Sequence, residues 1–596
     1  MSDNAALLTP PASVTDIPDD VWGKSNVDDS QSDVSDAGAG PSRKHRYERK
    51  MGDTELSYFL PSRQTGVNDM YLHLGFKAPE RVARRSRVCT AWAILRLRHP
   101  LLCACAELRD YDDVRFIYDA PSSAEDAYSD ADANLEYRTQ TKDELIDTYL
   151  NGPRTLSNSR LSYLILSEPQ SSPELMPTPP RTPSPPTLTL EADSASPDET
   201  EAEPKREYEL LICAMHFLGD GMALHQFAND FFGLLGGAKS DDALRDLLQE
   251  EWRTRWATAP EEVSYPIPGA IERRCGILTP RPQSVLPPAL EDNMPLPPSR
   301  FRRAAAQVDF QLSQQRLIGG QVFPRRKHPA RHTVVPTVSV PEERTKAILK
   351  KCKAHGVSIS AALFAVCNVA WARTRTSGGP GSSVAAPTLM YSALNLRPYF
   401  SVPRPAPRDS YWFLAIGYFN VVLPGFLPST PEAAEKSFWL RARQAKEQST
   451  CAAKSPLVAS RTHEMAQERG ARARMWAKED DEREAGTYVP PAPPAVPAEP
   501  RESVYPVRAK SSAAALIGLS LLGNLDGVYK HAAFPDAELH TLTTGSRQRQ
   551  GAMLLFGYTF KGRLWISLGY DSNGFEEGVV ERFWKEAMDC VDEFLG

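Results

Sequence analysis

One stretch at the end of the chain's first third constrains the local structure most. From Tyr208 it reads Tyr-Glu-Leu-Leu-Ile-Cys-Ala-Met, followed by His216-Phe-Leu-Gly-Asp220-Gly221-Met-Ala-Leu. The mostly apolar run is typical of a buried strand, and the Asp-Gly pair before an amphipathic run indicates a tight turn into a helix. This order places His216 at the end of a strand, where Gly221 lets the backbone bend sharply and leaves room for a ligand.

A histidine in that position has two interpretations. It can act as a general base near neutral pH, because its unperturbed pKa is about 6.5. It can equally be a core or turn residue, and the string by itself favours that interpretation. Motifs elsewhere in the chain are needed to choose between the two interpretations.

The composition is that of a globular protein. The chain has 596 residues, of which 41% are hydrophobic and 24% charged, enough for about two to four domains. A net charge of -6 argues against a nucleic-acid surface. The nine cysteines show no zinc-ligand pattern and predict reduced thiols, with no metal site. No secretory signal or long apolar run is apparent, so we expect a cytoplasmic protein without a membrane span.

The 51 prolines gather in particular segments and mark the organisation of the chain. The predicted parts are a disordered tail (1–45), an N-terminal half-domain (46–260) with a disordered insertion (168–206), a Pro-rich crossover linker (261–330), and a C-terminal half-domain (331–596) with a Pro-rich insertion (488–506). The first insertion separates two apolar runs, 161–166 and 207–215, which we expect to pair as a hairpin.

Strand and helix patterns alternate on both sides of the linker. In the first half we expect helices at 79–97, 142–150, from the His216 turn to 235, and at 241–256, with strands at 101–108, 114–118, 161–166 and 207–215. In the second half we expect strands at 333–340, 387–398, 417–423, 514–519, 553–560 and 564–570, with helices at 341–355, 358–371, within 431–485, and at 576–595.

Four strings, taken in their order, resemble those of the chloramphenicol-acetyltransferase-like superfamily. They are Leu97-Arg-His-Pro100, His216-Phe-Leu-Gly-Asp220-Gly221, Gly356-Val-Ser-Ile-Ser-Ala-Ala-Leu, and Asn395-Leu-Arg397-Pro398 followed by Gly417-Tyr-Phe-Asn420. The second matches the superfamily's His-x-x-x-Asp-Gly motif. The superfamily includes plant BAHD acyltransferases, peptide-synthetase condensation domains and fungal alcohol acetyltransferases. The chain is most similar to the fungal branch that contains the trichothecene O-acetyltransferases.

Some features depart from these relatives. The BAHD Asp-Phe-Gly-Trp-Gly loop is absent, and Leu555-Phe-Gly-Tyr-Thr is at best a trace of it. Condensation domains usually carry two adjacent histidines, whereas Met215 precedes His216 here. We therefore expect neither a plant-type arrangement around the acyl donor nor a peptide-synthetase module. His99, in the first string, is a second candidate for catalysis, although a histidine at a helix end more often contacts the terminal carbonyls.

The resemblance implies an α/β fold of two half-domains, each a mixed, mainly antiparallel sheet flanked by helices, with the active site at their interface. It implies that His216 is the general base, and that Asp220, Gly221 and Arg397 are structural residues at the active site. Asp220 should pair with Arg397, because an unpaired buried carboxylate is costly.

Further contacts at the site are left open. A backbone N–H near Gly221 at the helix start and the side chain of Asn420 are candidate donors to an oxyanion. Asn395 is a further candidate to contact the substrate or the oxyanion.

The resemblance further implies an acyl-CoA-dependent O-acyltransferase, transferring an acetyl group to a hydroxyl of a hydrophobic secondary metabolite in a fungus. Acetyl-CoA or another acyl-CoA would be the co-substrate, with no tightly bound cofactor. The expected partners are that donor and a small-molecule alcohol acceptor, and we expect a monomer. Two alternatives remain: a non-catalytic or binding relative of the same fold, and a condensation-like, amide-forming N-acyltransferase.

Overall fold

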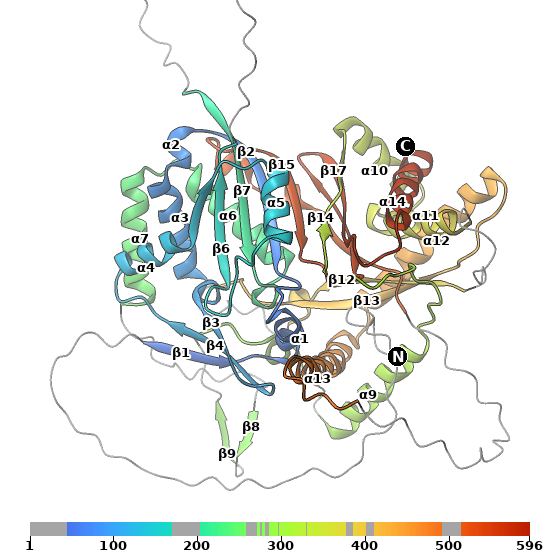
Figure 1. Ribbon diagram of the computed structural model, residues 1–596, viewed down its shortest axis with the longest axis horizontal. Helices are drawn as coiled ribbons and strands as arrows, with labels where there is room; N and C mark the ends of the chain where they lie inside the picture. Colours follow the sequence, from blue (N-terminus) through green and yellow to red (C-terminus); the bar gives the residue numbers. More distant parts are fainter. Residues whose placement is uncertain are drawn as a thin grey trace, which may run out of the picture.

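Figure 1 shows the computed structural model as two lobes set side by side, each containing a β-sheet with helices packed around it. Side chains are described for residues 45–169, 203–257, 285–295, 297, 299–328, 330–375, 386–400, 410–490 and 514–596, and backbone alone for 271–274, 277–280 and 376. Most of the predicted tail at 1–45 and of the insertions at 168–206 and 488–506 lies outside these residues.

The first lobe is built on a five-stranded sheet in the order β15-β2-β7-β6-β5. Its strands are β2 (Met70–Pro79), β5 (Leu135–Arg138), β6 (Ser162–Ser167), β7 (Lys205–Ala214) and β15 (Glu538–Ser546). Neighbouring strands are antiparallel except β5 and β6, which are parallel. The predicted hairpin between 161–166 and 207–215 is confirmed, since β6 and β7 pair directly.

Helices surround this sheet, and a smaller sheet in the order β1-β4-β3 lies below it (Figure 1). They are α1 (Asp53–Ser62), α2 (Glu80–Ala83), α3 (Arg85–Arg98), α4 (Ala124–Ala133), α5 (Lys142–Asn151), α6 (Gly221–Leu235) and α7 (Asp241–Arg255), and the small sheet contains β1 (Arg46–Lys50), β3 (Cys105–Asp110) and β4 (Asp113–Asp119). The single helix expected at 79–97 is wrong, because the backbone at Arg84 is extended, with a ψ of 133°. The strand expected from residue 101 begins only at Cys105, after a 3-10 turn.

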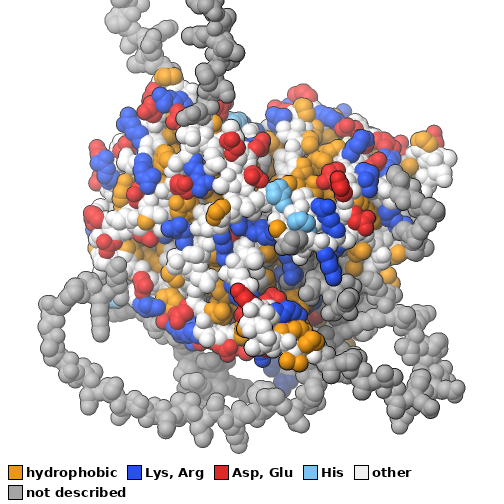
Figure 2. All heavy atoms as spheres, in the orientation of Figure 1, with side chains coloured by type: hydrophobic (Ala, Val, Ile, Leu, Met, Phe, Trp, Pro, Cys, Tyr) orange, Lys and Arg blue, Asp and Glu red, His pale blue; other side chains and the backbone are white. Residues whose placement is uncertain are grey.

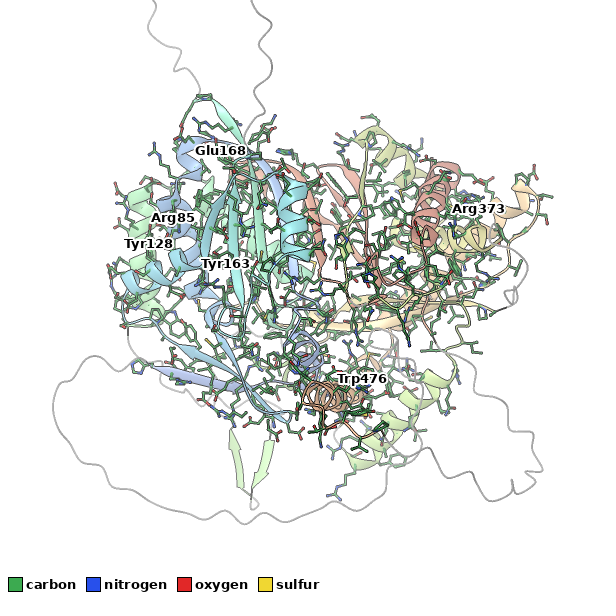
Figure 3. The ribbon with its side chains drawn as sticks, in the orientation of Figure 1. Arg85, Tyr128, Tyr163, Glu168, Arg373 and Trp476 are labelled. Atoms are coloured by element: carbon green, nitrogen blue, oxygen red, sulfur yellow. The ribbon has the colours of Figure 1, made fainter. Side chains whose placement is uncertain are left out.

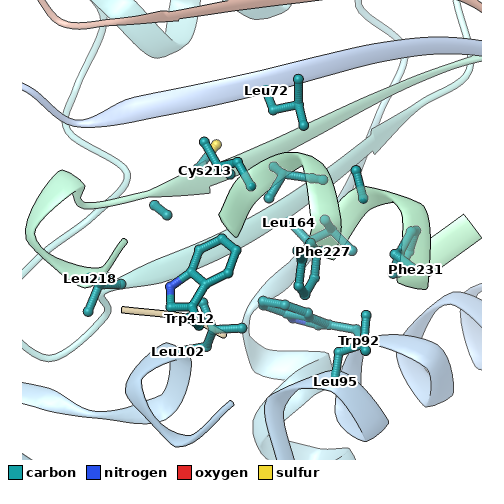
Figure 4. Close-up of a cluster of buried hydrophobic side chains, with 14 of the residues drawn as sticks. Leu72, Trp92, Leu95, Leu102, Leu164, Cys213, Leu218, Phe227, Phe231 and Trp412 are labelled. Atoms are coloured by element: carbon teal, nitrogen blue, oxygen red, sulfur yellow. The ribbon is translucent and has the colours of Figure 1, made fainter. Parts of the chain in front are cut away.

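The core of the first lobe also contains a residue from the second half of the chain. Phe227 of α6 contacts Trp92 of α3 edge to face, with ring centroids 5.5 Å apart. On its other side Phe227 meets Trp412, at 5.4 Å. Trp412 is fully buried in this cluster (Figure 4). The two lobes are thus joined by apolar packing.

The second lobe contains a seven-stranded sheet in the order β10-β17-β16-β14-β12-β13, with β11 also paired to β17. Its strands are β10 (Thr333–Val334), β11 (Thr337–Val340), β12 (Thr388–Asn395), β13 (Ile416–Leu423), β14 (Ile517–Asn524), β16 (Met553–Phe560) and β17 (Arg563–Asp571). The β12–β14 and β14–β16 pairs are parallel, and the others are antiparallel. Both large sheets are therefore mixed and mainly antiparallel, as expected.

The helices in the second half of the chain include α10 (Glu342–Ala354), α11 (Ile359–Thr376), α12 (Pro431–Ala453), α13 (Val458–Glu484) and α14 (Val579–Cys590), which continues into a π-helical turn (Val591–Leu595). Of these, α13 lies beside α1 of the first lobe (Figure 1). The hydroxyl of Ser358 accepts a hydrogen bond of 3.2 Å from the backbone N–H of Ala361 and so caps the start of α11. In the described part of the chain no single helix is long and apolar enough to cross a membrane; α10 and α11 pass that test only as a pair bent by 91°.

The predicted linker at 261–330 contains secondary structure within the residues that the structure describes. It contains β8 (Ile271–Arg274) paired with β9 (Ile277–Pro280), the short α8 (Leu290–Asn293) and α9 (Arg300–Gln315). The 16 residues of α9 include no proline, so the helix forms between proline-rich flanks. An ion pair of 2.7 Å between Asp309 and Arg461 fastens α9 to α13.

One strand crosses from the second half of the chain into the first lobe. β15 pairs antiparallel with β2, from Met70 opposite Ser546 to Lys77 opposite Glu538. The sequence pattern predicted no strand at 538–546, because its apolar residues are too few to mark one. The division into halves at residue 331 therefore does not hold for this strand.

The surface carries both signs of charge. On the face in Figure 2, acidic and basic side chains are interspersed over both lobes. Such mixing is typical of a solvated surface without a strong field of one sign.

Candidate active site

β7 carries His216 to the junction of the two lobes. After the strand, His216–Leu218 form one 3-10 turn, and α6 begins at Gly221. Phe217 and Leu218 are fully buried, and the Phe217 ring packs edge to face on Phe59 at 5.3 Å. These apolar anchors hold the turn, so the position of the His216 backbone is fixed by packing rather than by a flexible loop.

The His216 ring lines a cavity of about 300 Å³ between the lobes. This volume lies at the lower end of the range for small-molecule sites, roughly 300–1,000 Å³. The walls come from α1, the start of α6, β12, β13, β14, β16 and β15. The lining residues include Tyr58, Asn68, Met70, His216, Asp220, Gly221, Asn395, Arg397, Ile416, Tyr418, Leu519, Leu522, Ser546, Gln548 and Phe556.

The surroundings of His216 favour a neutral imidazole. The ring stacks on that of Tyr58, with centroids 4.4 Å apart and planes inclined by 21°. Burial lowers the pKa of His216 from its ordinary value, although the negative charge of Asp220 opposes that shift. Its Nδ1 atom is buried and has no hydrogen-bond partner among the described residues. The neutral ring, which has a free lone pair to accept a proton, therefore predominates near pH 7.

Asp220 makes the ion pair with Arg397 that the sequence predicted. The Nη1 atom of Arg397 donates to both carboxylate oxygens, at 3.0 and 2.8 Å. The backbone N–H groups of Met222 and Ala223 donate to Oδ1 at 3.1 and 3.2 Å, and that of Ala415 donates to Oδ2 at 3.0 Å. The carboxylate thus caps α6 and fastens it to the second lobe, which leaves it no free oxygen for proton transfer.

Gly221 and the two candidate asparagines have different surroundings. Gly221 lines the cavity, and its N–H forms no hydrogen bond within the described chain, since Asp220 takes the next two N–H groups. Asn395 also lines the cavity, and its Oδ1 accepts from the backbone N–H of Arg397 at 3.1 Å. Asn420 does not line the cavity, although its buried Oδ1 has no partner among the described residues. The structure therefore brings Gly221 and Asn395 to His216, but not Asn420.

Sequence reasoning missed three residues around His216. The hydroxyl groups of Tyr58 and Tyr418 contact each other directly. The guanidinium of Arg469, on α13, lies 5.3 Å from the Tyr58 ring and 4.6 Å from that of Tyr418. Tyr418 lies two residues before Asn420 in the string Gly417-Tyr-Phe-Asn420, and side chains two apart in a strand point to the same face. The sequence could therefore have indicated Tyr418 as a third candidate on this strand. Tyr58 and Arg469 belong to no motif.

His99, the other candidate histidine, lies outside the cavity. Its Nδ1 is 3.1 Å from the Ser410 hydroxyl, and its ring centroid is 4.3 Å from that of Tyr411. Burial lowers its pKa to about 3. His99 is therefore a buried link between α3 and the chain before β13. No group of His, Cys, Asp and Glu able to hold a metal ion occurs within the described part of the chain.

The arrangement of two lobes, with a histidine turn at their junction, is the chloramphenicol-acetyltransferase-like fold. The chain is similar in structure to TRI3, the trichothecene 15-O-acetyltransferase from Fusarium sporotrichioides, with a TM-score of 0.63 at 11% identity over 94% of this chain and 96% of that one. It is also similar to the first condensation domain of the CDA synthetase, with a TM-score of 0.50 at 12% identity over 93% and 97% of the two chains. No protein-family model and no curated protein sequence matches the chain. At such identities the likeness establishes the fold alone.

Proposed function

We propose that the protein is an O-acyltransferase that moves an acyl group, an acetyl group in the simplest case, from a coenzyme A thioester to the hydroxyl of a hydrophobic acceptor. The observation that carries this proposal is the position of His216, a neutral imidazole at the wall of a cavity between two lobes. A base at a junction can meet a donor and an acceptor that come from different directions.

In this mechanism His216 takes the hydroxyl proton of the acceptor while the oxygen attacks the thioester carbonyl. A C–O bond forms, and the carbonyl becomes a tetrahedral oxyanion. The intermediate collapses, the C–S bond breaks, and the thiolate takes the proton from the imidazolium, which leaves an ester and free coenzyme A. Positioned base catalysis of this kind contributes roughly 10²–10⁴-fold. The free N–H of Gly221 supplies a donor to the oxyanion.

The side chains that line the cavity favour an apolar acceptor. Among the side chains that face the space beside His216 are Met70, Ile416, Leu519, Leu522 and Phe556. Burial of an acceptor against such groups stabilises its binding by about 25 cal/mol for each Å² of apolar surface removed from water. The few polar groups then orient its hydroxyl toward the imidazole.

Thiol release from acetyl-CoA in the presence of a panel of hydrophobic alcohols tests this proposal. We expect wild-type protein to release thiol and form ester, and His216→Ala to fold normally but lose about 10²–10⁴-fold in rate. His332→Ala is the matched control, because the His332 side chain is 46% exposed and outside the cavity. Equal turnover by wild type and His216→Ala would contradict the assignment of the base.

An amide-forming reaction is the second candidate, supported by the structural likeness to a condensation domain. The same base would then receive a proton from an amine as it attacks the thioester. A parallel panel of amines separates the two reactions, since only the N-acyltransferase forms amides from them. If wild type and His216→Ala give the same rates with both alcohols and amines, the result would favour a non-catalytic relative of the fold.

A further inference from the structure

A second cavity, of about 500 Å³, lies on the other side of one wall of the His216 cavity. Its lining comes from the end of α1 and the turn after it, the end of α5, residues 330–331, α13, residue 547 and residues 549–550. Trp476 marks its position on α13 in Figure 3. The cavity is lined mainly by polar and charged side chains, in contrast to the apolar walls beside His216.

The wall between the two cavities is made of two chain segments. The N–H of Asn68 donates to the carbonyl of Arg547 at 2.9 Å, and the N–H of Arg547 donates to the carbonyl of Asp69 at 2.9 Å. Side chains alternate along the second segment: Ser546 and Gln548 line the His216 cavity, whereas Arg547 and Arg549 line the second cavity. A ligand in the second cavity is thus one backbone thickness from the proposed site of chemistry.

Three arginines in the second cavity have no ion-pair partner in the described chain. The Arg547 guanidinium donates only to carbonyl groups, those of Tyr149, Gly152 and Pro153, at 2.6–3.2 Å. Arg331 likewise donates to two carbonyls, at 2.8 and 3.4 Å. The Arg549 guanidinium makes no hydrogen bond to the described residues, and it lies 5.9 Å from the centroid of the Trp476 ring.

The remaining charges in this cavity do not neutralise the three arginines. Arg63 is already paired with Asp481. Asp480 is the one carboxylate among the lining residues, and its nearest hydrogen-bond partner is Arg483 at 3.4 Å. Burial lowers the pKa of Arg549 to about 10, and the charge of Asp480 opposes that shift only in part. A multivalent anion bound here would balance the excess positive charge, and planar guanidinium groups match the geometry of phosphate oxygens.

We propose that this arginine pocket binds the phosphate groups of a phosphorylated ligand. The phosphate groups could belong to either of two ligands. One is the acyl-CoA donor, an assignment that rests on the proposed function, and the other is a separate phosphorylated molecule. In the first case the pocket would hold the anionic end of the donor while its thioester reaches the neighbouring cavity. In the second it would bind a ligand beside the site of chemistry.

Calorimetric titration with inorganic pyrophosphate tests the site independently of catalysis. We expect wild-type protein to bind it and Arg549→Gln to bind about tenfold or more weakly. Arg245→Gln is the control, because Arg245 is 63% exposed and paired with Asp242 outside the pocket. Absence of binding by wild type, or equal affinity in Arg549→Gln, would overturn the proposal.

Steady-state kinetics distinguish the two sources. S-acetyl-N-acetylcysteamine is an acetyl thioester without phosphate, so it cannot use the pocket. If the donor's phosphates bind there, Arg549→Gln raises KM for acetyl-CoA by about tenfold and leaves the rate with the phosphate-free thioester unchanged. If pyrophosphate binding falls while both donors react as before, the phosphate comes from a separate ligand. Absence of all turnover would count against the proposed function, and the pyrophosphate titration would still decide the site.

Discussion

Arg397 holds Asp220 through an ion pair of 2.8 Å across 177 positions of sequence, and it thereby fastens the helix start next to His216 to the second lobe. The Nη2 atom of the same arginine donates to the carbonyls of Tyr411 and Phe413, at 3.3 and 3.1 Å. One guanidinium thus gathers α6, the chain before β13 and the end of β12 around the cavity. The geometry of the site depends on this contact.

Replacement of Asp220 by asparagine should therefore weaken both the fold and the reaction. Asparagine caps a helix about as well as aspartate, so the change removes charge and little else. The Asp220 side chain is 5% exposed and that of Arg397 24%, so we expect a loss of about 2–3 kcal/mol in the free energy of unfolding, below the value for a fully buried pair. Urea unfolding measures this loss, and thiol release should fall with it because the His216 turn loosens.

Asp132→Asn is the matched control for that experiment. Asp132 pairs with Arg85 at 2.8 Å (Arg85 is labelled in Figure 3), but the two side chains are 42% and 46% exposed. Solvent screens such a pair, so the loss should stay below about 1 kcal/mol. Equal losses in the two variants would show that the Asp220–Arg397 pair contributes no more than a surface ion pair.

The pH dependence of the reaction should have an acid limb set by His216. The base works as the neutral imidazole, and burial lowers its pKa, so the neutral form predominates at pH 7 and is lost only as the pH falls through a value below about 6.5. We expect kcat/KM to be flat between pH 7 and 8 and to fall below pH 6.5. A midpoint above pH 7 in the wild-type profile would contradict a buried neutral base.

Tyr58 should act as a positioning residue for this histidine, because its ring stacks on the imidazole and excludes water from it. Tyr58→Ala removes that cover, so the pKa of His216 should rise toward about 6.5 and the acid limb should move to higher pH, with kcat about tenfold lower. Tyr58→Phe keeps the ring and serves as the control, with an unchanged limb. An acid limb at the same pH in Tyr58→Ala would leave Tyr58 with a packing role only.

Local patterns and short motifs account for what the sequence could predict. The β6–β7 hairpin follows from two apolar runs, even though the insertion at 168–206 separates them. The partnership of Asp220 with Arg397 follows from the motif resemblance, and the buried position of the carboxylate explains why a cation has to be there. The first prediction rests on local apolar patterns, and the second rests on a recurring motif.

The parts that could not be predicted depend on packing between distant segments. Tyr58 reaches His216 because α1 packs against the turn, and no spacing rule links two residues 158 positions apart. β15 reads Glu-Leu-His-Thr-Leu-Thr-Thr-Gly-Ser. Thr543 and Thr544 are buried in it because the strand pairs with β2, and not because of their own apolarity. Tertiary pairing outweighs a weak local pattern here.

The crossing strand leads to a last prediction: residues 45–330 should not fold alone, but should fold with residues 331–596 supplied as a second chain. Without β15, the ten-residue β2 becomes an exposed sheet edge, and the apolar cluster around Phe227 loses Trp412. Size-exclusion chromatography should show the single fragment aggregated and the co-expressed pair as one folded complex. If the fragment alone gives a monomer with a cooperative melting transition, β15 is dispensable to the first lobe. The lobes would then be separable domains, and the cavity between them would owe its shape to the Asp220–Arg397 contact instead of to the shared sheet.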